Sequence, residues 1–394
     1  MRQRDHDASY PLLAAALIAR NEEATLPRIL DDISGSVDEI IVVDTGSSDG
    51  TCAIATTAGA HVVHHTWAAD FAAARNAAFA ECTALWVMWL DADDRIPPMA
   101  SNGLRSLKAK LPTLEASAIY VPYRLNFASA GAFGGANNRV RLVRRSEQFL
   151  WVGRIHETLY IGDAPALWTS ETWVEHRPLV EPDPRKQDRD RRLLDGLLRD
   201  GDRSATVLLH YGMLLKDLGE FDAARRLLEE CLIICHAPAP RYTALMTSAA
   251  CCRATGNWGE HIAYLHEAVE LNSRRAEAFV GLGDVHAAFG DWQGAMPFFR
   301  AALGLIRPEL GAYVEAAYSW LPLIGLARCS RALGDDDEAR RLLAEAAAVA
   351  PERTGDFARI AEEFLGVGST ESARPDASES RPHSAASVAG ISAS

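Results

Sequence analysis

The sequence predicts an α/β domain with a Rossmann-like mixed sheet, followed by an all-α domain of helical repeats. Short apolar runs alternate with amphipathic patterns near the N-terminus, and a Gly-centred turn recurs between helical patterns in the second half. The chain of 394 residues, 48% of them hydrophobic, is long enough to bury two cores. We expect a flexible N-terminus over 1–10, the α/β domain over 11–180, a linker and helix over 181–204, repeats over 205–365 and a disordered tail over 366–394.

Four apolar runs near the N-terminus predict strands, and the amphipathic segments between them predict helices. This order is typical of βαβ units, which build parallel sheets. The expected strands are Leu13–Ala19, Glu39–Asp44, His61–His65 and Leu85–Leu90. The helices between them are expected near Ala24–Ser34, Gly50–Ala58 and Phe71–Cys82. Farther along we expect a helix near Met99–Lys110 and strands at Ala118–Phe127, Arg139–Arg145 and Thr172–His176.

A glycine followed by an acidic or amide residue marks turns between helical patterns in the second half of the chain. The four turn glycines are 37, 34 and 44 residues apart, and they are Gly219, Gly256, Gly290 and Gly334. A period near 34 resembles the tetratricopeptide repeat. The last interval is longer and contains Pro308 and Pro322, so we expect the final repeat to be irregular. An ordinary helical bundle is the alternative.

Charge and cysteine content limit the partners and the compartment. The net charge of −13 argues against a nucleic-acid partner, because binding to phosphates requires a positive surface. Seven cysteines without a C-x-x-C pair or zinc-ligand spacing fit a reduced, cytoplasmic protein. The apolar run Pro11–Ala19 could form a signal-peptide core, but Asp5 and Asp7 precede it, so we interpret it as a buried strand. No stretch approaches the ~18 apolar residues of a membrane span.

An acidic cluster, Asp91-Ala92-Asp93-Asp94, follows the fourth predicted strand. Three carboxylates at the carboxyl end of a central strand repel one another unless a cation joins them, so the cluster predicts a bound metal. Carboxylate oxygens suit Mg²⁺ or Mn²⁺. The alternative is a solvated turn in which an aspartate caps the following helix.

The second predicted strand also ends in an acidic residue, Asp44, followed by Thr45 and a Gly/Ser-rich turn. Ligands of doubly wound sheets lie across the carboxyl ends of the strands, so Asp44 and the acidic cluster should face one crevice. Asp44 could there accept hydrogen bonds from a base or ribose. We expect Asp49 to be structural, as a cap of the next helix.

The turn after the first strand, Ala19-Arg20-Asn21-Glu22-Glu23, lacks the G-x-G-x-x-G pattern, and the chain has no P-loop. A nucleotide would therefore be held by side chains and a metal. Arg75 lies in the helix before the acidic strand, where it could reach a diphosphate. An arginine on the surface of that helix is the alternative.

These segments, in this order and spacing, resemble the family 2 glycosyltransferases of the GT-A fold over residues 12–180. They are Ala-Arg-Asn-Glu-Glu from Ala19, Val-Val-Asp-Thr-Gly-Ser-Ser-Asp-Gly-Thr from Val42, Ala-Arg-Asn from Ala74 and Leu-Asp-Ala-Asp-Asp from Leu90. The resemblance implies a UDP-sugar donor bound by Ala19, Asn21, Glu22, Asp44, Thr45, Arg75, Asp91, Ala92 and Asp93. It implies that Asp44 contacts the base and Arg75 the donor side. Asp91 and Asp93 would contact the ribose and the metal-bound diphosphate.

An arginine-rich predicted strand leads to Gly153-Arg154-Ile155-His156-Glu157, which by the same resemblance closes the far side of the donor site. An inverting transfer requires a base that takes the acceptor proton, and Glu157 is the candidate. His156 would complete the metal site with Asp91 and Asp93, or orient Glu157; a buried structural histidine is the alternative. The chain lacks the Glu-Asp and Gln-x-x-Arg-Trp elements of polysaccharide synthases, which leaves the base assignment open.

The leading hypothesis is transfer of a hexose, of the glucose or N-acetylglucosamine type, to a Cys, Ser or Thr side chain of a peptide presented by the repeats. A GT-A domain followed by tetratricopeptide-like helices resembles bacterial peptide S- or O-glycosyltransferases of the sublancin-modifying type. A cell-envelope saccharide or a small natural product is the alternative acceptor. Other classes are an interaction scaffold with an inactive enzyme domain, and a nucleotidyltransferase or phosphatase. A homodimer formed through the repeats also stays open.

Overall fold

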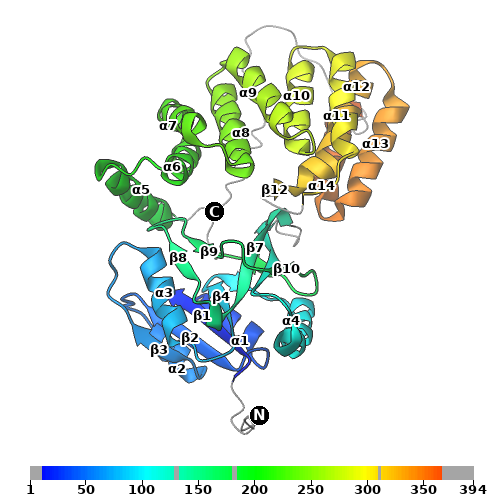
Figure 1. Ribbon diagram of the computed structural model, residues 1–394. Coiled ribbons are helices and arrows are strands. Elements are labelled where there is room, and N and C mark those ends of the chain that lie inside the picture. Colours follow the sequence, from blue (N-terminus) through cyan, green and yellow to red (C-terminus); the bar gives the residue numbers. More distant parts are fainter. Residues whose placement is uncertain (1–10, 128–132, 180–183, 309–311, 366–394) are drawn as a thin grey trace.

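The computed structural model describes residues 11–127, 133–179, 184–308 and 312–365. They form an α/β domain and a curved row of helices that arches over it (Figure 1). The expected flexible N-terminus and disordered tail lie outside the described residues, as does the start of the expected linker.

The α/β domain is built on a mixed sheet whose strands follow the order β3-β2-β1-β4-β7-β6-β11-β5. Pairing is parallel from β3 through β4, as predicted, and antiparallel between β4 and β7 and between β7 and β6. The first strands are β1 (Leu13–Ala19), β2 (Glu39–Asp44), β3 (His61–His64), β4 (Trp86–Asp91) and β5 (Asp94–Arg95). The later strands are β6 (Ala118–Phe127), β7 (Phe133–Arg144), β10 (Ala166–Trp168) and β11 (Val174–His176), and β8 (Leu150–Val152) pairs with β9 (Thr158–Tyr160) as a separate ribbon.

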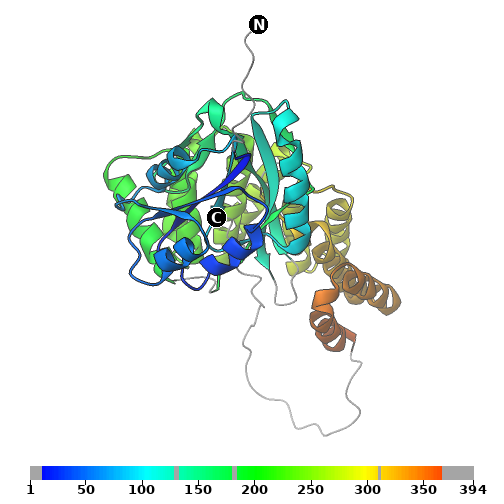
Figure 2. The ribbon, with the colours of Figure 1, turned by 90° about the horizontal axis from the view of Figure 1, so that it is seen from below.

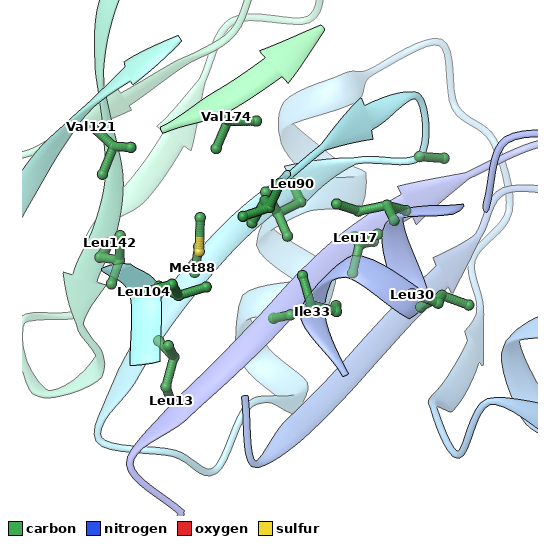
Figure 3. Packing of buried hydrophobic residues seen from close by; sticks show 14 of the residues in the cluster. Leu13, Leu17, Leu30, Ile33, Met88, Leu90, Leu104, Val121, Leu142 and Val174 are labelled. Carbon is green, nitrogen blue, oxygen red and sulfur yellow. The ribbon is translucent and has the colours of Figure 1, made fainter. Parts of the chain in front are cut away.

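Helices cover both faces of this sheet. They are α1 (Leu26–Ile33), α2 (Thr51–Thr57), α3 (Phe71–Glu81) and α4 (Pro98–Lys110). Successive side chains of a strand point to opposite faces, so Leu13 and Leu17 of β1 join Met88 of β4 against α1 and α4 (Figure 3). Ala14 and Ala16 face the alanine-rich helix α3 on the other side. Burial of each large apolar side chain contributes about 1.5–3 kcal/mol to the stability of the fold. This packing holds the strands in place, and with them the residues at their carboxyl ends.

The second half of the described chain is helical. Its helices are α5 (Pro184–Arg199), α6 (Ala205–Asp217), α7 (Phe221–Ile234), α8 (Pro238–Ala254), α9 (Trp258–Leu271), α10 (Ala276–Ala288), α11 (Trp292–Leu303), α12 (Trp320–Ala332), α13 (Asp336–Val349) and α14 (Thr354–Leu365). The four predicted turn glycines adopt φ angles between +74° and +88°, a left-handed conformation that ends a helix at little cost when the residue is glycine. Asn257, Asp291 and Asp335 then cap the helices that follow.

The row of helices contacts the α/β domain at its start and again between α11 and α12. Leu194 and Leu197 of α5 are buried in one core with α6, beside Phe71 at the start of α3. Between α11 and α12, a short strand β12 (Tyr313–Val314) pairs with β7 in antiparallel register. This strand falls in the long last interval between turn glycines, where an irregular repeat was expected. The last helices of the row project to one side of the α/β domain (Figure 2).

The differences from the sequence expectation concern short strands and one strand end. Strands β8 to β10 are three residues each, too short to show an alternating pattern. Strand β7 begins well before the expected Arg139, because Gly135 and Ala136 pair with both β6 and β12. No apolar pattern marks this part of the strand, so only its partners on both sides define it.

Candidate functional site

Asp44 and Asp91 lie at one edge of the sheet, on either side of β1. In the strand register Asp44 is paired with Ala19, and Asp91 is paired with Ile18. Parallel strands are ≈ 4.8 Å apart, so these two carboxylates flank the end of a single strand. The carboxyl ends of β2, β1 and β4 therefore lie side by side at the edge where the sequence predicted a crevice.

Asp44 is 4% exposed and accepts hydrogen bonds from the amides of Gly46 (3.2 Å) and Ser47 (3.1 Å). His64 Nδ1 lies 3.3 Å from the same carboxylate. Burial alone would raise the pKa of Asp44, but the hydrogen bonds from Ser47, Gly46 and His64 lower it overall. Asp44 is therefore a charged acceptor held in place by its own turn.

The loops after β1 and β2 are joined by hydrogen bonds between the two sequence motifs. Asn21 Oδ1 accepts from the amide of Ser48 at 2.8 Å, and the amide of Glu22 donates to Thr51 Oγ1 at 2.8 Å. Thr45 Oγ1 donates to the carbonyl of Ala19 at 3.2 Å. Asp49 is structural, but Gly50 occupies the cap position of α2, and Asp49 instead accepts from the Thr51 amide at 3.0 Å. The motif residues thus build one rigid rim.

Arg75 is buried between two carboxylates and two indole rings. Its Nη2 donates to Asp91 Oδ1 at 2.7 Å, and its Nε donates to Glu157 Oε1 at 2.5 Å. The guanidinium lies 4.8 Å from the ring centroids of both Trp89 and Trp151. The surface-helix alternative is wrong for this residue, since Arg75 is only 7% exposed.

The charges around Arg75 support one another. Burial alone would lower the pKa of Arg75, but Asp91 and Glu157 raise it overall. The same contact lowers the pKa of Asp91 far below its usual range, against the effect of burial. Arg75 therefore keeps Asp91 ionised, and the same guanidinium also binds Glu157.

The three carboxylates of the acidic cluster have different surroundings. Asp94 is fully buried and accepts from Arg141 Nη1 and the Tyr123 hydroxyl, both at 3.0 Å, and from the amide of Asp91 at 2.9 Å. Asp93 is 7% exposed, and its Oδ2 accepts from Lys186 Nζ at 2.6 Å. Asp94 is thus held by groups inside the α/β domain, whereas Asp93 pairs with Lys186 of α5.

His176, at the end of β11, faces the same two carboxylates. Its Nδ1 is 3.6 Å from Asp93 Oδ1 and 3.9 Å from Asp94 Oδ1, and this buried atom has no hydrogen-bond partner. Among the described residues, Asp93, Asp94 and His176 form a group whose ligand atoms lie within 4.8 Å of one another; Asp44, Cys52 and His64 form another. Because Arg141 and Tyr123 hold Asp94, the atoms that fit a divalent ion best are those of Asp93 and His176.

Two residues expected to bind metal are placed elsewhere. Asp91 faces Arg75, and neither Asp91 nor His156 belongs to a metal-type group within the part of the chain described. The His156 ring stacks on His210 of α6, with centroids 3.7 Å apart and planes 9° from parallel. Burial, together with His210, holds the pKa of His156 well below its usual range. The pair is neutral and joins the two domains.

Glu157 follows His156 in the loop between β8 and β9, and Arg75 binds it as described. The loop is anchored because the carbonyl of Arg154 accepts from the amide of Phe71 at 2.8 Å. Asp190 of α5 lies nearby, and burial, with a contribution from Glu157, raises the pKa of Asp190 although Arg189 opposes this. The candidate base therefore lies where α5 approaches the α/β domain.

Sequence reasoning missed the residues that come from β11 and the helical row. His176 ends a strand that the sequence did predict, so its place at the carboxyl edge is a signal that could have found it. Lys186 and His210 have no such local signal, because each acts across a domain boundary.

Comparisons with known proteins agree with this architecture. Residues 15–123 match glycosyl transferase family 2, and residues 204–237 match a tetratricopeptide repeat. The chain therefore has an N-terminal GT-A domain, in which residues 15–123 match family 2, followed by tetratricopeptide-like helices. No helix among the described residues is long and apolar enough to cross a bilayer.

Several individual proteins are similar to parts of the chain. A TPR repeat-containing protein of Synechococcus elongatus is 48% identical over 99 residues, covering 25% of each chain. An uncharacterized glycosyltransferase of Rickettsia felis is 34% identical over 84 residues, 21% of this chain and 29% of that protein. The lipopolysaccharide core biosynthesis glycosyltransferase LpsC of Rhizobium meliloti is 27% identical over 186 residues, 43% of this chain and 64% of that protein. The chain thus spans only about a quarter of the first two relatives.

Solved structures are similar to parts of the chain. MamA matches 43% of this chain and 86% of its own, at 16% identity and a TM-score of 0.35. Glucosyl-3-phosphoglycerate synthase from Mycobacterium tuberculosis, solved with Mn²⁺ and uridine diphosphate, matches 29% of this chain and 44% of its own, at 28% identity and a TM-score of 0.25.

Proposed function

We propose that this protein is a glycosyltransferase that uses a UDP-sugar donor and a divalent metal. The observation that carries the proposal is the edge of the sheet where Asp44 and Asp91 flank β1 while Asp93 faces the unpartnered Nδ1 of His176. Nucleotides in doubly wound folds bind at such an edge. The family 2 match over residues 15–123 contains Asp44, Arg75, Asp91 and Asp93.

Each side chain of the edge has a task in this proposal. Asp44, held charged by its turn, accepts hydrogen bonds from the uracil base or ribose. Asp93 and His176 hold Mn²⁺ or Mg²⁺, which neutralises the departing diphosphate. Asp91 contacts the ribose while Arg75 fixes its orientation.

Glu157 is the proposed base of an inverting displacement. It must take a proton from the acceptor as the bond to the sugar forms on the face opposite the diphosphate. Arg75 binds one oxygen of Glu157, Oε1, and so holds this carboxylate in place. A thiol acceptor needs less help from a base than a hydroxyl, because its ordinary pKa is near 8.5.

The proposed acceptor is a Cys, Ser or Thr side chain of a peptide bound along the helical row. Helical repeats form concave surfaces that suit extended or helical peptides. The row arches over the sheet and is attached to it at α5 and again at β12, so a bound peptide would remain close to the crevice (Figure 1).

A cell-envelope saccharide is the second candidate acceptor. It is favoured by the similarity to LpsC, whose name assigns it to lipopolysaccharide core biosynthesis and which matches 43% of this chain. An interaction scaffold with an inactive enzyme domain is disfavoured because the carboxylates of the donor edge are all present and held in place.

The decisive experiment measures release of uridine diphosphate from UDP-glucose and UDP-N-acetylglucosamine, with and without Mn²⁺. We expect metal-dependent release by the wild type and loss of at least 100-fold in Asp93→Asn, since the variant lacks the charge that holds the metal. The control is Asp337→Asn, an exposed acid on α13, which should release at the wild-type rate. Equal turnover by Asp93→Asn would show that the site is assigned wrongly.

The acceptor class is tested with the same enzyme. An increase in the mass of a Cys- or Ser-containing peptide by that of the transferred sugar supports the peptide proposal. Transfer to a purified lipopolysaccharide core, with no peptide product, would replace it by the saccharide alternative. Donor binding without any release would support the scaffold alternative.

A further inference from the structure

A lysine from the helical row already neutralises the carboxylate that is best placed for metal binding. Lys186 Nζ lies 2.6 Å from Asp93 Oδ2, and His176 Nδ1 faces the other oxygen of the same carboxylate at 3.6 Å. Asp93 is 7% exposed and the Lys186 side chain 38%, so solvent screens this contact only in part. The ammonium group of Lys186 therefore contacts the carboxylate to which a divalent ion would bind.

Lys186 and a divalent ion cannot both bind the Asp93 carboxylate strongly at the same time. An ion shared by Asp93 and His176 would place two positive charges within a few ångströms of the ammonium, which is strongly unfavourable away from bulk water. Lys186 has another carboxylate in reach of its charge, because Glu22 also interacts with it electrostatically. The ammonium can leave Asp93 without losing every anionic neighbour.

Lys186 belongs to the element that carries the helical row. It lies in the first turn of α5, whose later residues Leu194 and Leu197 are buried in the core shared with α6. Arg191 of the same helix pairs with Glu220 at the start of α7. Lys186 therefore lies on a helix that packs against the first repeat helices.

We propose that Lys186 is a built-in competitor of the divalent cation for Asp93, so that loading of the donor site releases the first turn of α5. The inference rests on the metal site of the proposed function and adds its coupling to the helical row. In the metal-free protein Lys186 neutralises the charge of Asp93 and holds the first turn of α5 against it. With metal bound, α5 is freed from the acidic edge, which changes the acceptor side of the crevice.

The test measures binding of Mn²⁺ alone to the full chain, by calorimetry and by the electron paramagnetic resonance signal of free Mn²⁺. Lys186→Met keeps the length of the side chain without its charge and should bind Mn²⁺ about tenfold more tightly than the wild type, equivalent to about 1.4 kcal/mol. Lys186→Glu should bind more tightly still, and Lys186→Arg should stay near the wild type. Lys110→Met, which breaks an exposed lysine–glutamate contact, is the matched control.

Hydrogen exchange of peptides from α5 gives a second readout. Mn²⁺ should increase exchange in the first turn of α5 in the wild type and leave it unchanged in Lys186→Met. Unchanged or increased protection of the wild-type helix would contradict the coupling.

The binding data also separate this inference from the proposed function. If the wild type and Lys186→Met bind Mn²⁺ equally, and Asp93→Asn abolishes binding in both backgrounds, the metal site stands and the competition is refuted. Weaker binding by Lys186→Met refutes the competition as well. If neither protein binds Mn²⁺, the metal site and the inference both fail.

Discussion

Arg75 and Glu157 are 82 positions apart in the chain and form a 2.5 Å ion pair in the centre of the α/β domain. The same guanidinium binds Asp91, so one arginine links the end of β4 to the loop between β8 and β9. This relationship connects a residue expected near the donor with the residue expected near the acceptor.

Replacing Arg75 by Met should destabilise the fold strongly. The change leaves Asp91 and Glu157 without their partner, and removing one partner of a buried ion pair typically costs about 3–5 kcal/mol. Denaturant unfolding monitored by tryptophan fluorescence measures this cost. Arg191→Met, which breaks a half-exposed pair with Glu220, should cost less than about 1 kcal/mol. Similar costs for the two variants would mean that Arg75 is not the central brace.

Replacement by asparagine should affect stability strongly at Asp94 and metal binding at Asp93. Asp94→Asn removes the charge facing the fully buried Arg141, so we expect a loss of about 3–5 kcal/mol in the free energy of unfolding. Asp93→Asn should fold with a much smaller loss but lose the rise in melting temperature that Mn²⁺ gives the wild type. Thermal melts with and without Mn²⁺ check both variants. A persisting Mn²⁺ effect in Asp93→Asn would remove Asp93 from the metal site.

The stacked pair of His156 and His210 should make the protein less stable in mild acid. Burial lowers the pKa of His210 to about 4, whereas an unfolded histidine titrates near 6.5. Below pH 6.5 His210 binds a proton in the unfolded chain but not in the folded protein, so the free energy of unfolding decreases. At pH 5 this costs about 2 kcal/mol.

The variant His210→Phe tests this pH dependence because it keeps a stacking ring without a titratable group. Unfolding free energies at pH 7.5 and pH 5 should differ less in His210→Phe than in the wild type. His61→Phe, at an exposed position, is the control and should retain the wild-type difference. An unchanged difference in His210→Phe would contradict the assignment.

Gly135 should be required for attachment of the helical row to the sheet. A Cβ atom at this position would lie 2.5 Å from the carbonyl oxygen of Tyr313, too close for the pairing of β7 with β12. We expect Gly135→Ala to increase hydrogen exchange at residues 313–318 and to reduce transfer to the acceptor more than donor hydrolysis. Gly259→Ala, where added atoms meet open space, is the control. Normal protection of β12 in Gly135→Ala would refute the prediction.

Much of the fold could be predicted because it depends on local pattern. The bounds of β1, β2 and β6 agree with the apolar runs that predicted them. The turn glycines have the left-handed backbone that glycine alone adopts easily. The beginning of β7 could not be predicted in this way, because its Gly and Asn residues carry no apolar alternation.

The candidate site was only partly predictable for a similar reason. The sequence indicated an acidic edge with Asp44, Asp91 and Asp93, and the strand register brings Asp44 and Asp91 to the same edge of the sheet, with Asp93 two residues beyond the end of β4. It offered His156 as a metal ligand, as a residue that orients Glu157 or as a buried structural histidine; the structure stacks that ring on His210, and His176 faces Asp93. His156 lies in a loop and His176 at the end of β11, and only the folded structure shows which of them faces Asp93.

The sequence by itself determined the bounds of β1, β2 and β6, where the helical turns fall and that three carboxylates cluster at the end of β4, since each of these depends on a few neighbouring residues. Only the tertiary structure decided what each carboxylate does. Asp91 faces Arg75, Asp94 faces Arg141 and Asp93 faces Lys186, partners that are 16, 47 and 93 positions away. Identical side chains acquire different roles because charge, burial and hydrogen bonding are set by groups that the folded chain brings together.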